Sequence, residues 1–145
     1  YGPYGRPDMA YFKFTKLIES KKKIDIYNNG EMKRDFTYID DIVEGVFTVM
    51  KSPPKPMISK ITNASAPYRL LTMGNNNPVT LDRFISAIEN SLSKKAKKNM
   101  LPMQDGDVPI TFADISDLSD NFGFKPSTSI EDGIDEFVKW YKLFY

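Results

Sequence analysis

The sequence predicts a mixed α/β fold in which amphipathic helices alternate with a few short strands. Three observations support this prediction. Apolar residues recur at the spacing of one helix face in several long stretches. Short alternating or apolar stretches, typical of strands, lie between them. Turn-forming Gly, Pro and Asn residues separate the two kinds of stretch.

The first part of the chain is expected to contain a helix and two strands. Residues 9–20 carry apolar side chains at helical spacing and predict a helix. Residues 23–27 alternate between polar and apolar and end at the turn signal 28–30, which predicts a short strand. Residues 35–39 predict a second short strand.

Asp40 and Asp41 are expected to open the next helix, because acidic side chains suit a helix N-terminus. Neighbouring residues on a helix point about 100° apart, so we interpret the pair as N-cap residues and not as a metal site. Gly45 lies inside this helix, where Gly costs about 1 kcal/mol relative to Ala, and it is therefore expected to allow close packing.

A proline-rich loop at residues 52–56 and a buried strand at residues 68–73, ending at Gly74, are expected next. Thr80 is then predicted to cap a helix that runs to Leu92. Val79 before this cap and Phe84 inside the helix are expected to form a hydrophobic staple.

Two further helices complete the prediction. A short one starts at Asp114 or Ser116 and ends at Gly123, and the last one is opened by residues 129–132. The order of elements is that of an α/β or α+β protein.

Composition excludes several chemistries. The 145 residues contain no Cys and no His, so thiol nucleophiles, Ser–His pairs and Cys/His zinc sites are absent. Acid–base chemistry would have to come from Asp, Glu, Lys or Tyr. No run of 18 apolar residues predicts a membrane span, and no membrane partner is expected.

The charge balance of 20 basic and 19 acidic residues argues against a nucleic-acid partner. Two lysine clusters each follow a predicted helix, and we interpret both as solvated helix C-termini. Their members are Lys21, Lys22 and Lys23, and Lys94, Lys95, Lys97 and Lys98. Trp140 is expected to pack in the core.

Three segments stand above composition: residues 1–10, residues 30–42, and residues 104–108 with Ala113 and Asp114 soon after. With them go the motifs GRPDMA at 5–10, KRDFTYIDDIVEG at 33–45, GNNNPV at 74–79 and the ending from GFKPSTSIEDGI at 123–134. In this order and spacing they resemble the C-terminal part of extended short-chain dehydrogenase/reductase enzymes that act on nucleotide sugars, most like the UDP-glucuronate 4-epimerase branch. The resemblance implies a Rossmann-type parent enzyme that uses NAD, an isomerase of polysaccharide biosynthesis in the cytoplasm.

Two family elements are missing from this sequence: the Gly-rich dinucleotide loop and the catalytic Tyr-x-x-x-Lys pair. The resemblance therefore implies a C-terminal portion of a longer protein, which agrees with an opening that reads as the middle of a loop. Residues 1–39 and 75–145 would belong mainly to the UDP-sugar-binding domain, and residues 40–74 to the NAD-binding Rossmann half. No catalytic residue, no cofactor site and no metal site are expected within residues 1–145, and the chain alone is expected to be inactive.

The resemblance also implies roles for polar residues. Arg34 matches an arginine that binds the UDP diphosphate, with a surface ion pair to Asp35 or Glu31 as the alternative. Asp107 matches an acid that accepts a hydrogen bond from the ribose, with a turn-forming role beside Gly106 as the alternative.

The resemblance also implies expectations for further positions of this sequence. Gln104 stands where many relatives have a second phosphate-binding Arg, and Asp105 where a Pro is usual. Arg6 would lie near the sugar carboxylate, or only brace its loop. Four more residues are expected at the nucleotide, with core packing as the alternative for the aromatic one: Met9, Ala10, Tyr27 and Thr111.

The implied reaction is inversion at C4 of a UDP-hexuronic acid, in which NAD takes a hydride and returns it to the other face of a rotated sugar. During this reaction, this chain would hold the UDP part of the substrate. Another nucleotide-sugar enzyme (a 4,6-dehydratase, a decarboxylase or UDP-glucose 4-epimerase) and a non-catalytic UDP-binding module remain alternatives. The parent is expected to be a homodimer, and the isolated chain to self-associate through surface that faces the Rossmann half.

Overall fold

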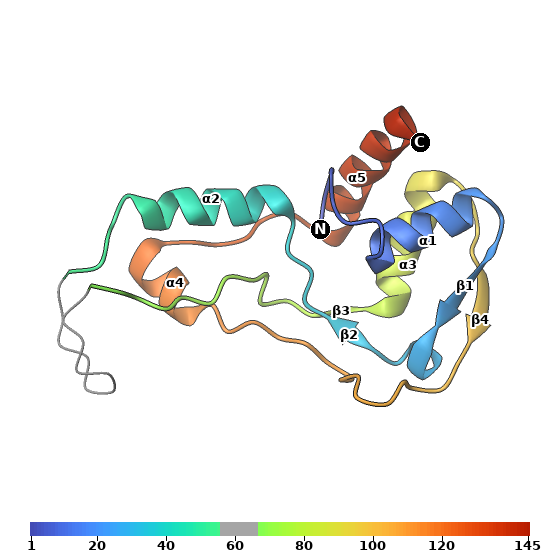
Figure 1. Cartoon of the computed structure of the whole chain (residues 1–145), viewed down its shortest axis with the longest axis horizontal. Helices are drawn as coiled ribbons and strands as arrows, with labels where there is room; N and C mark the ends of the chain where they lie inside the picture. The colour runs from blue at the N-terminus through green and yellow to red at the C-terminus, as the bar shows by residue number, and fades with distance from the viewer. Residues whose placement is uncertain (56–66) are drawn as a thin grey trace.

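The computed structural model describes residues 1–55 and 67–145 (Figure 1). Its elements, in chain order, are α1 (Ala10–Glu19), β1 (Lys23–Ile26), the 3₁₀ turn η1 (Tyr27–Gly30), β2 (Lys33–Arg34), α2 (Ile39–Met50), β3 (Val79–Thr80), α3 (Leu81–Leu92), β4 (Lys97–Met100), α4 (Ser116–Phe122) and α5 (Ile130–Phe144). The helices α1, α3 and α5 gather beside the β1–β4 pair, while α2 and α4 lie at the other end of the molecule. Extended segments connect the two groups.

The main core lies where α1, α3 and α5 meet β1. The buried apolar faces of these elements form one cluster, including Phe12, Ile24, Phe84, Ile88 and Phe137. Val79 and Phe84 are buried in this same cluster, as expected for a hydrophobic staple. Trp140 packs against the cluster, which confirms its predicted packing role.

Three helix termini lie where the sequence predicts them. The hydroxyl of Thr80 accepts a hydrogen bond from the Arg83 N–H at 3.3 Å, and the hydroxyl of Ser129 accepts one from the Asp132 N–H at 3.0 Å. Gly123 ends α4 in the left-handed conformation, with φ +67°. These three helix termini can be predicted from the sequence because each depends only on local backbone geometry.

The capping role predicted for Asp40 and Asp41 is wrong. Tyr38 holds the N-cap position of α2, and no side chain caps this helix. Both acids lie in the first turn, and the buried carboxylate of Asp41 accepts hydrogen bonds from the N–H groups of Ser127 and Thr128. Asp41 thus takes part in a tertiary contact with residues 86 and 87 positions further along the chain, which local sequence reasoning could not detect.

The strands pair in two small sheets. β1 and β4 are parallel, with Ile24 beside Lys98, and β2 and β3 are antiparallel, with Arg34 beside Val79. A parallel bridge also joins Lys33 to Ile110. β3 and β4 were not expected: β4 is exposed along its whole length, so it lacks the apolar alternation that marks a strand.

Two predicted strands are not formed as expected. The stretch 35–39 contains no strand residue: β2 ends at Arg34, and α2 begins at Ile39. The Asp35 N–H donates to the Thr111 hydroxyl at 3.0 Å and not to a neighbouring strand. Residues 67–73 form neither helix nor strand, and Tyr68 and Leu70 are exposed. No strand in the described part of the chain pairs with them.

A second, smaller core joins α4 to α2. Ile115, Leu118 and Phe124 are buried, and Leu71 and Met73 pack against them. A Cβ atom at Gly45 would lie 2.8 Å from the Phe124 ring and 2.9 Å from the Met73 sulfur. The prediction that Gly45 permits close packing is therefore confirmed.

The second lysine cluster does not simply end a helix. Lys97 and Lys98 lie in β4, and three of its members form ion pairs: Lys94 with Glu19, Lys95 with Glu89 and Lys98 with Asp82. The proline-rich loop is irregular at residues 53–55, and Pro56 lies outside the described residues. Among the helices of the described ranges, none has the length and apolarity that crossing a membrane requires.

Candidate functional site

A cavity of about 430 Å³ lies beside α1 and the segment that carries β2. Its wall is mainly apolar, and a few polar side chains project into it, as is usual for sites that bind small molecules. The lining residues that matter below are Met9, Ala10, Tyr11, Tyr27, Arg34, Asp35, Asp107 and Thr111.

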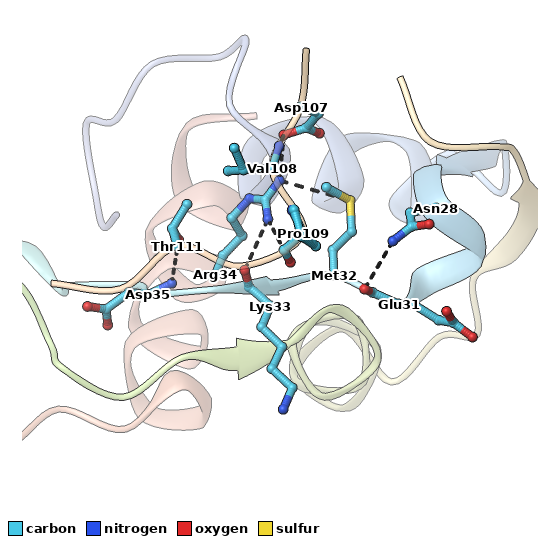
Figure 2. A network of polar contacts seen from close by, with 10 residues as sticks. All are labelled: Asn28, Glu31, Met32, Lys33, Arg34, Asp35, Asp107, Val108, Pro109 and Thr111. Carbon is cyan, nitrogen blue, oxygen red and sulfur yellow. Dashed lines mark hydrogen bonds and ion pairs between the residues drawn. The ribbon is translucent and has the colours of Figure 1, made fainter. Parts of the chain in front are cut away.

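Arg34 is held at this cavity by four partners, of which the Met32 sulfur, 4.0 Å from Nη2, is the most distant (Figure 2). Its Nη2 donates to Oδ1 of Asp107 at 2.7 Å, and the two side chains are 26% and 34% exposed. Its Nη1 donates to the carbonyl oxygens of Lys33, at 3.0 Å, and Pro109, at 3.4 Å. The ion pair expected as an alternative, with Asp35 or Glu31, is replaced by one with the other proposed ligand residue, Asp107.

Asp107 follows the turn at Gly106, whose φ of +80° favours glycine. Its Oδ1 also accepts a hydrogen bond from the Val108 N–H at 2.8 Å, and its own N–H donates to the Gln104 carbonyl at 3.2 Å. The turn-forming alternative is therefore present in the structure together with the contact to Arg34. The position leaves Asp107 on the cavity wall.

Thr111 is fixed by the backbone of β2. Its N–H donates to the Lys33 carbonyl at 3.2 Å, and its hydroxyl accepts from the Asp35 N–H at 3.0 Å. The segment 107–111 therefore runs beside β2, which brings residues more than 70 positions apart in the sequence to one wall.

Tyr27, Met9 and Ala10 complete the group of predicted residues at the cavity. Tyr27 begins η1 and is half-buried, so it lies just after β1 and not inside it. Beside them, burial raises the pKa of the Tyr11 hydroxyl above its ordinary value.

Two predicted residues lie away from the cavity wall. Arg6 pairs with Asp8 within its own loop, Nε to Oδ1 at 3.1 Å, and its side chain is 71% exposed. Gln104 is exposed and contributes its backbone carbonyl to the turn before Asp107. The structure thus brings six of the eight predicted residues together: Met9, Ala10, Tyr27, Arg34, Asp107 and Thr111.

Sequence reasoning missed several lining residues. Phe14, Phe36 and Phe84 face the cavity, and the rings of Phe36 and Phe84 stack at 4.6 Å. Phe84 was expected on a core-facing helix stripe, but nothing in the pattern distinguished a cavity wall from a filled core. Asp35 was considered only as an ion-pair partner. In the described ranges, no cluster of acidic side chains is arranged to hold a metal ion.

Known proteins share sequence similarity with this chain. The model of the NAD dependent epimerase/dehydratase family matches residues 1–65. Protein CapI of Staphylococcus aureus is 49% identical over 151 residues, and a probable UDP-glucuronate 4-epimerase of Rhizobium meliloti is 46% identical over 152. Both alignments cover 100% of this chain and 45% of the relative, so the chain spans about half the length of these relatives.

Solved structures show the same relationship. UDP-glucuronic acid 4-epimerase from Bacillus cereus, in complex with UDP-glucuronic acid and NAD, matches with a TM-score of 0.83 and 30% identity over 100% of this chain and 43% of its own. UDP-glucose 4-epimerase from Thermotoga maritima has the same fold, with a TM-score of 0.81 at 20% identity over 99% of this chain and 43% of its own. Residues 1–65 thus match the NAD dependent epimerase/dehydratase family model, and the chain has the fold of the corresponding part of the UDP-glucuronic acid 4-epimerase structure.

Proposed function

We propose that this chain is the UDP-sugar-binding part of an NAD-dependent UDP-sugar 4-epimerase acting on UDP-glucuronate. The observation that carries the proposal is the convergence of Arg34, Asp107, Thr111 and Tyr27 on one cavity. A nucleotide sugar needs a cation for its diphosphate, an acceptor for its ribose hydroxyls and a flat apolar contact for its base. This wall offers all three.

Each side chain has a defined part in this proposal. Arg34 presents planar N–H donors to diphosphate oxygens, a geometry that Lys cannot reproduce. The Asp107 carboxylate accepts from a ribose hydroxyl, and Tyr27 contacts the uracil. Met9, Ala10 and Thr111 close the wall around the nucleotide. Binding energy collected at UDP, remote from the reacting carbon, positions C4 of the sugar for hydride transfer.

Arg6 and Gln104 do not line the cavity. In the proposal Arg6 contacts the hexuronate carboxylate, but this requires it to exchange its partner Asp8 for the substrate. Gln104, where relatives carry an Arg, leaves Arg34 as the sole Lys or Arg on the cavity wall within the described residues.

The parent protein also supplies the hydride chemistry. NAD, when bound there, would accept the hydride from C4 and return it. We assign residues 40–74 to the NAD-binding half and residues 1–39 and 75–145 mainly to the sugar-binding half of the parent enzyme. Because this sequence contains neither the Gly-rich loop nor Tyr-x-x-x-Lys, we expect the chain alone to be inactive and not to bind NAD tightly. A homodimeric parent, a cytoplasmic location and a role in polysaccharide synthesis rest on the family resemblance.

The test is a titration of the ¹⁵N-labelled chain with UDP, followed by NMR. Shift changes should concentrate on cavity residues such as Arg34, Tyr27 and Thr111, and should be absent when NAD replaces UDP. Arg69→Ala, which removes an arginine at α4, serves as the matched control and should bind UDP normally. Shift changes centred on α4, or no saturable response at all, would contradict the proposal.

Substrate choice needs a second assay on the longer protein. We expect conversion of UDP-glucuronate and little conversion of UDP-glucose. The reverse preference would favour a UDP-glucose 4-epimerase.

A further inference from the structure

We propose that Asp107 fills the anion position of Arg34 in the free chain, so that nucleotide binding replaces its carboxylate with a diphosphate oxygen. The displaced Asp107 then becomes available to the ribose. This inference rests on the proposed function, because it describes how the same two residues change partners. It makes Asp107 both a ligand of the nucleoside and a competitor of the diphosphate.

The contacts of Arg34 show that its position does not depend on Asp107. Nη1 is bound by the carbonyl oxygens of Lys33 and Pro109, on the side away from the carboxylate. Nη2 donates to Asp107 at 2.7 Å and makes a long contact with the Met32 sulfur at 4.0 Å, and Nε has no hydrogen-bond partner among the described residues. Loss of the carboxylate would therefore leave the guanidinium in place, held by the two carbonyl oxygens and by the Met32 sulfur, with Nη2 and Nε able to donate to two oxygens of one phosphate group.

Asp107 is similarly ready to change partners. Its Oδ1 accepts from both Arg34 and Val108, whereas Oδ2 has no partner among the described residues. Because both side chains are about a third exposed, water screens their attraction. An ion pair of this kind favours the bound arrangement by about fivefold at most, so a ligand can replace it.

The charges around Arg34 favour replacement of the Asp107 carboxylate by a diphosphate. The carboxylate neutralises Arg34, and the neighbouring carboxylate of Asp35 is occupied by the N–H groups of Asn76, Asn77 and Ala113. Lys33 points away from the guanidinium in Figure 2. A diphosphate with two or more negative charges is a stronger partner for Arg34 than one carboxylate, and its binding returns Asp107 to the cavity.

The test compares two ligands that differ in what Asp107 can do for them. Inorganic pyrophosphate offers charge and no ribose, whereas UDP offers both. Calorimetric titrations at low salt would use the wild-type chain, Asp107→Ala and the isosteric Asp107→Asn. Asp105→Ala is the matched control, because it removes the same charge from the same loop at an exposed residue that makes no contact with Arg34.

We expect Asp107→Ala to bind pyrophosphate about fivefold more tightly than wild type, since the competing carboxylate is gone. UDP should bind less tightly, because a charged acceptor for the ribose is lost, and the ratio of UDP to pyrophosphate affinity should fall by about tenfold or more. Asp107→Asn should change in the same directions by less. Asp105→Ala should stay within about twofold of wild type for both ligands.

Equal or weaker pyrophosphate binding by both Asp107 variants would overturn the exchange, as would the absence of pyrophosphate binding in every chain. An equal gain in Asp105→Ala would also overturn it, by showing a general charge effect. If pyrophosphate behaves as expected but wild type fails to bind UDP, the exchange stands and the proposed function fails.

Discussion

The carboxylate of Asp35 accepts a hydrogen bond from the backbone N–H of Ala113 at 3.0 Å, although the two residues are 78 positions apart. The same carboxylate accepts from the N–H groups of Asn76 and Asn77, at 3.0 and 3.3 Å. Three segments therefore meet at one side chain, which lies next to Arg34 in sequence and lines the same cavity. Asp35 holds together the wall on which the proposed ligand residues stand.

Replacing Asp35 with Ala should destabilise the chain and disturb this wall. Three backbone donors lose their acceptor, and we expect the free energy of unfolding to fall by about 1–3 kcal/mol. Urea denaturation would measure the change. Asp105→Ala, at an exposed acid in the loop that precedes Asp107, should stay within about 0.5 kcal/mol of wild type. Equal effects of the two substitutions would contradict the structural role of Asp35.

Gly45→Ala should also be destabilising, even though Ala has the higher helix propensity. The gain of about 1 kcal/mol from propensity is opposed by contacts of the new Cβ with the Phe124 ring and the Met73 sulfur. The ring is part of a buried cluster and has little room to move, so we expect a net loss of about 1 kcal/mol in the free energy of unfolding. Pairing the substitution with Phe124→Leu should reduce this loss. A simple gain in stability would show that α2 does not pack closely on Phe124.

Acid should weaken the chain partly through Glu89. Desolvation by burial alone would raise the pKa of this carboxyl, but hydrogen bonds from Lys95 and Ala96 outweigh it and leave the pKa below its ordinary value. A lowered folded-state pKa gives stability that is present above the unfolded pKa of about 4.3 and is lost as pH falls through the folded value. The stability difference between wild type and Glu89→Gln should therefore be largest near pH 7, as about 1–3 kcal/mol, and should shrink in acid.

Denaturation at several pH values would measure this difference. Glu44→Gln, at an exposed carboxyl on α2, is the control and should differ little from wild type at any pH. A difference for Glu89→Gln that stays constant from neutral to acid would contradict the assignment.

The exposed apolar face of α2 should cause self-association of the isolated chain. Val43, Val46, Phe47 and Met50 are between 43% and 68% exposed on this helix. Contiguous apolar surface of this kind favours association with another apolar surface. We expect sedimentation velocity to show a mass that rises with concentration, and Phe47→Ser to reduce the effect. Phe144→Ser, at an equally exposed phenylalanine on α5, should not; if it does, α2 is not the contact.

Local signals in the sequence predicted the helices and their caps, as at Thr80 and Ser129, because these depend on neighbouring residues. Strands were predicted less well. β4 carries two lysines and an asparagine and has no apolar face, and residues 68–73 have a strand-like composition but no pairing strand in the described ranges. Whether a stretch forms a strand depends on a pairing strand that is distant in the sequence.

The same distinction applies to the site. The residues at the cavity were found through a resemblance between motifs and not from their spacing, since Arg34 and Asp107 are 73 positions apart. Their direct contact, and the role of Asp35 beside them, could be seen only in three dimensions. Arg6 shows the converse, because its motif was recognised but its side chain pairs locally with Asp8, away from the cavity.

The most direct test of the central claim is the affinity of this chain for UDP-glucuronate before and after Arg34→Lys. The substitution keeps the charge and removes the planar pair of donors, with thermal unfolding as a check that the fold is retained. We predict saturable binding by wild type and a loss of about tenfold or more in the variant. Equal affinity of the two chains, or no saturable binding by wild type, would contradict the claim that Arg34 anchors a nucleotide sugar in this cavity.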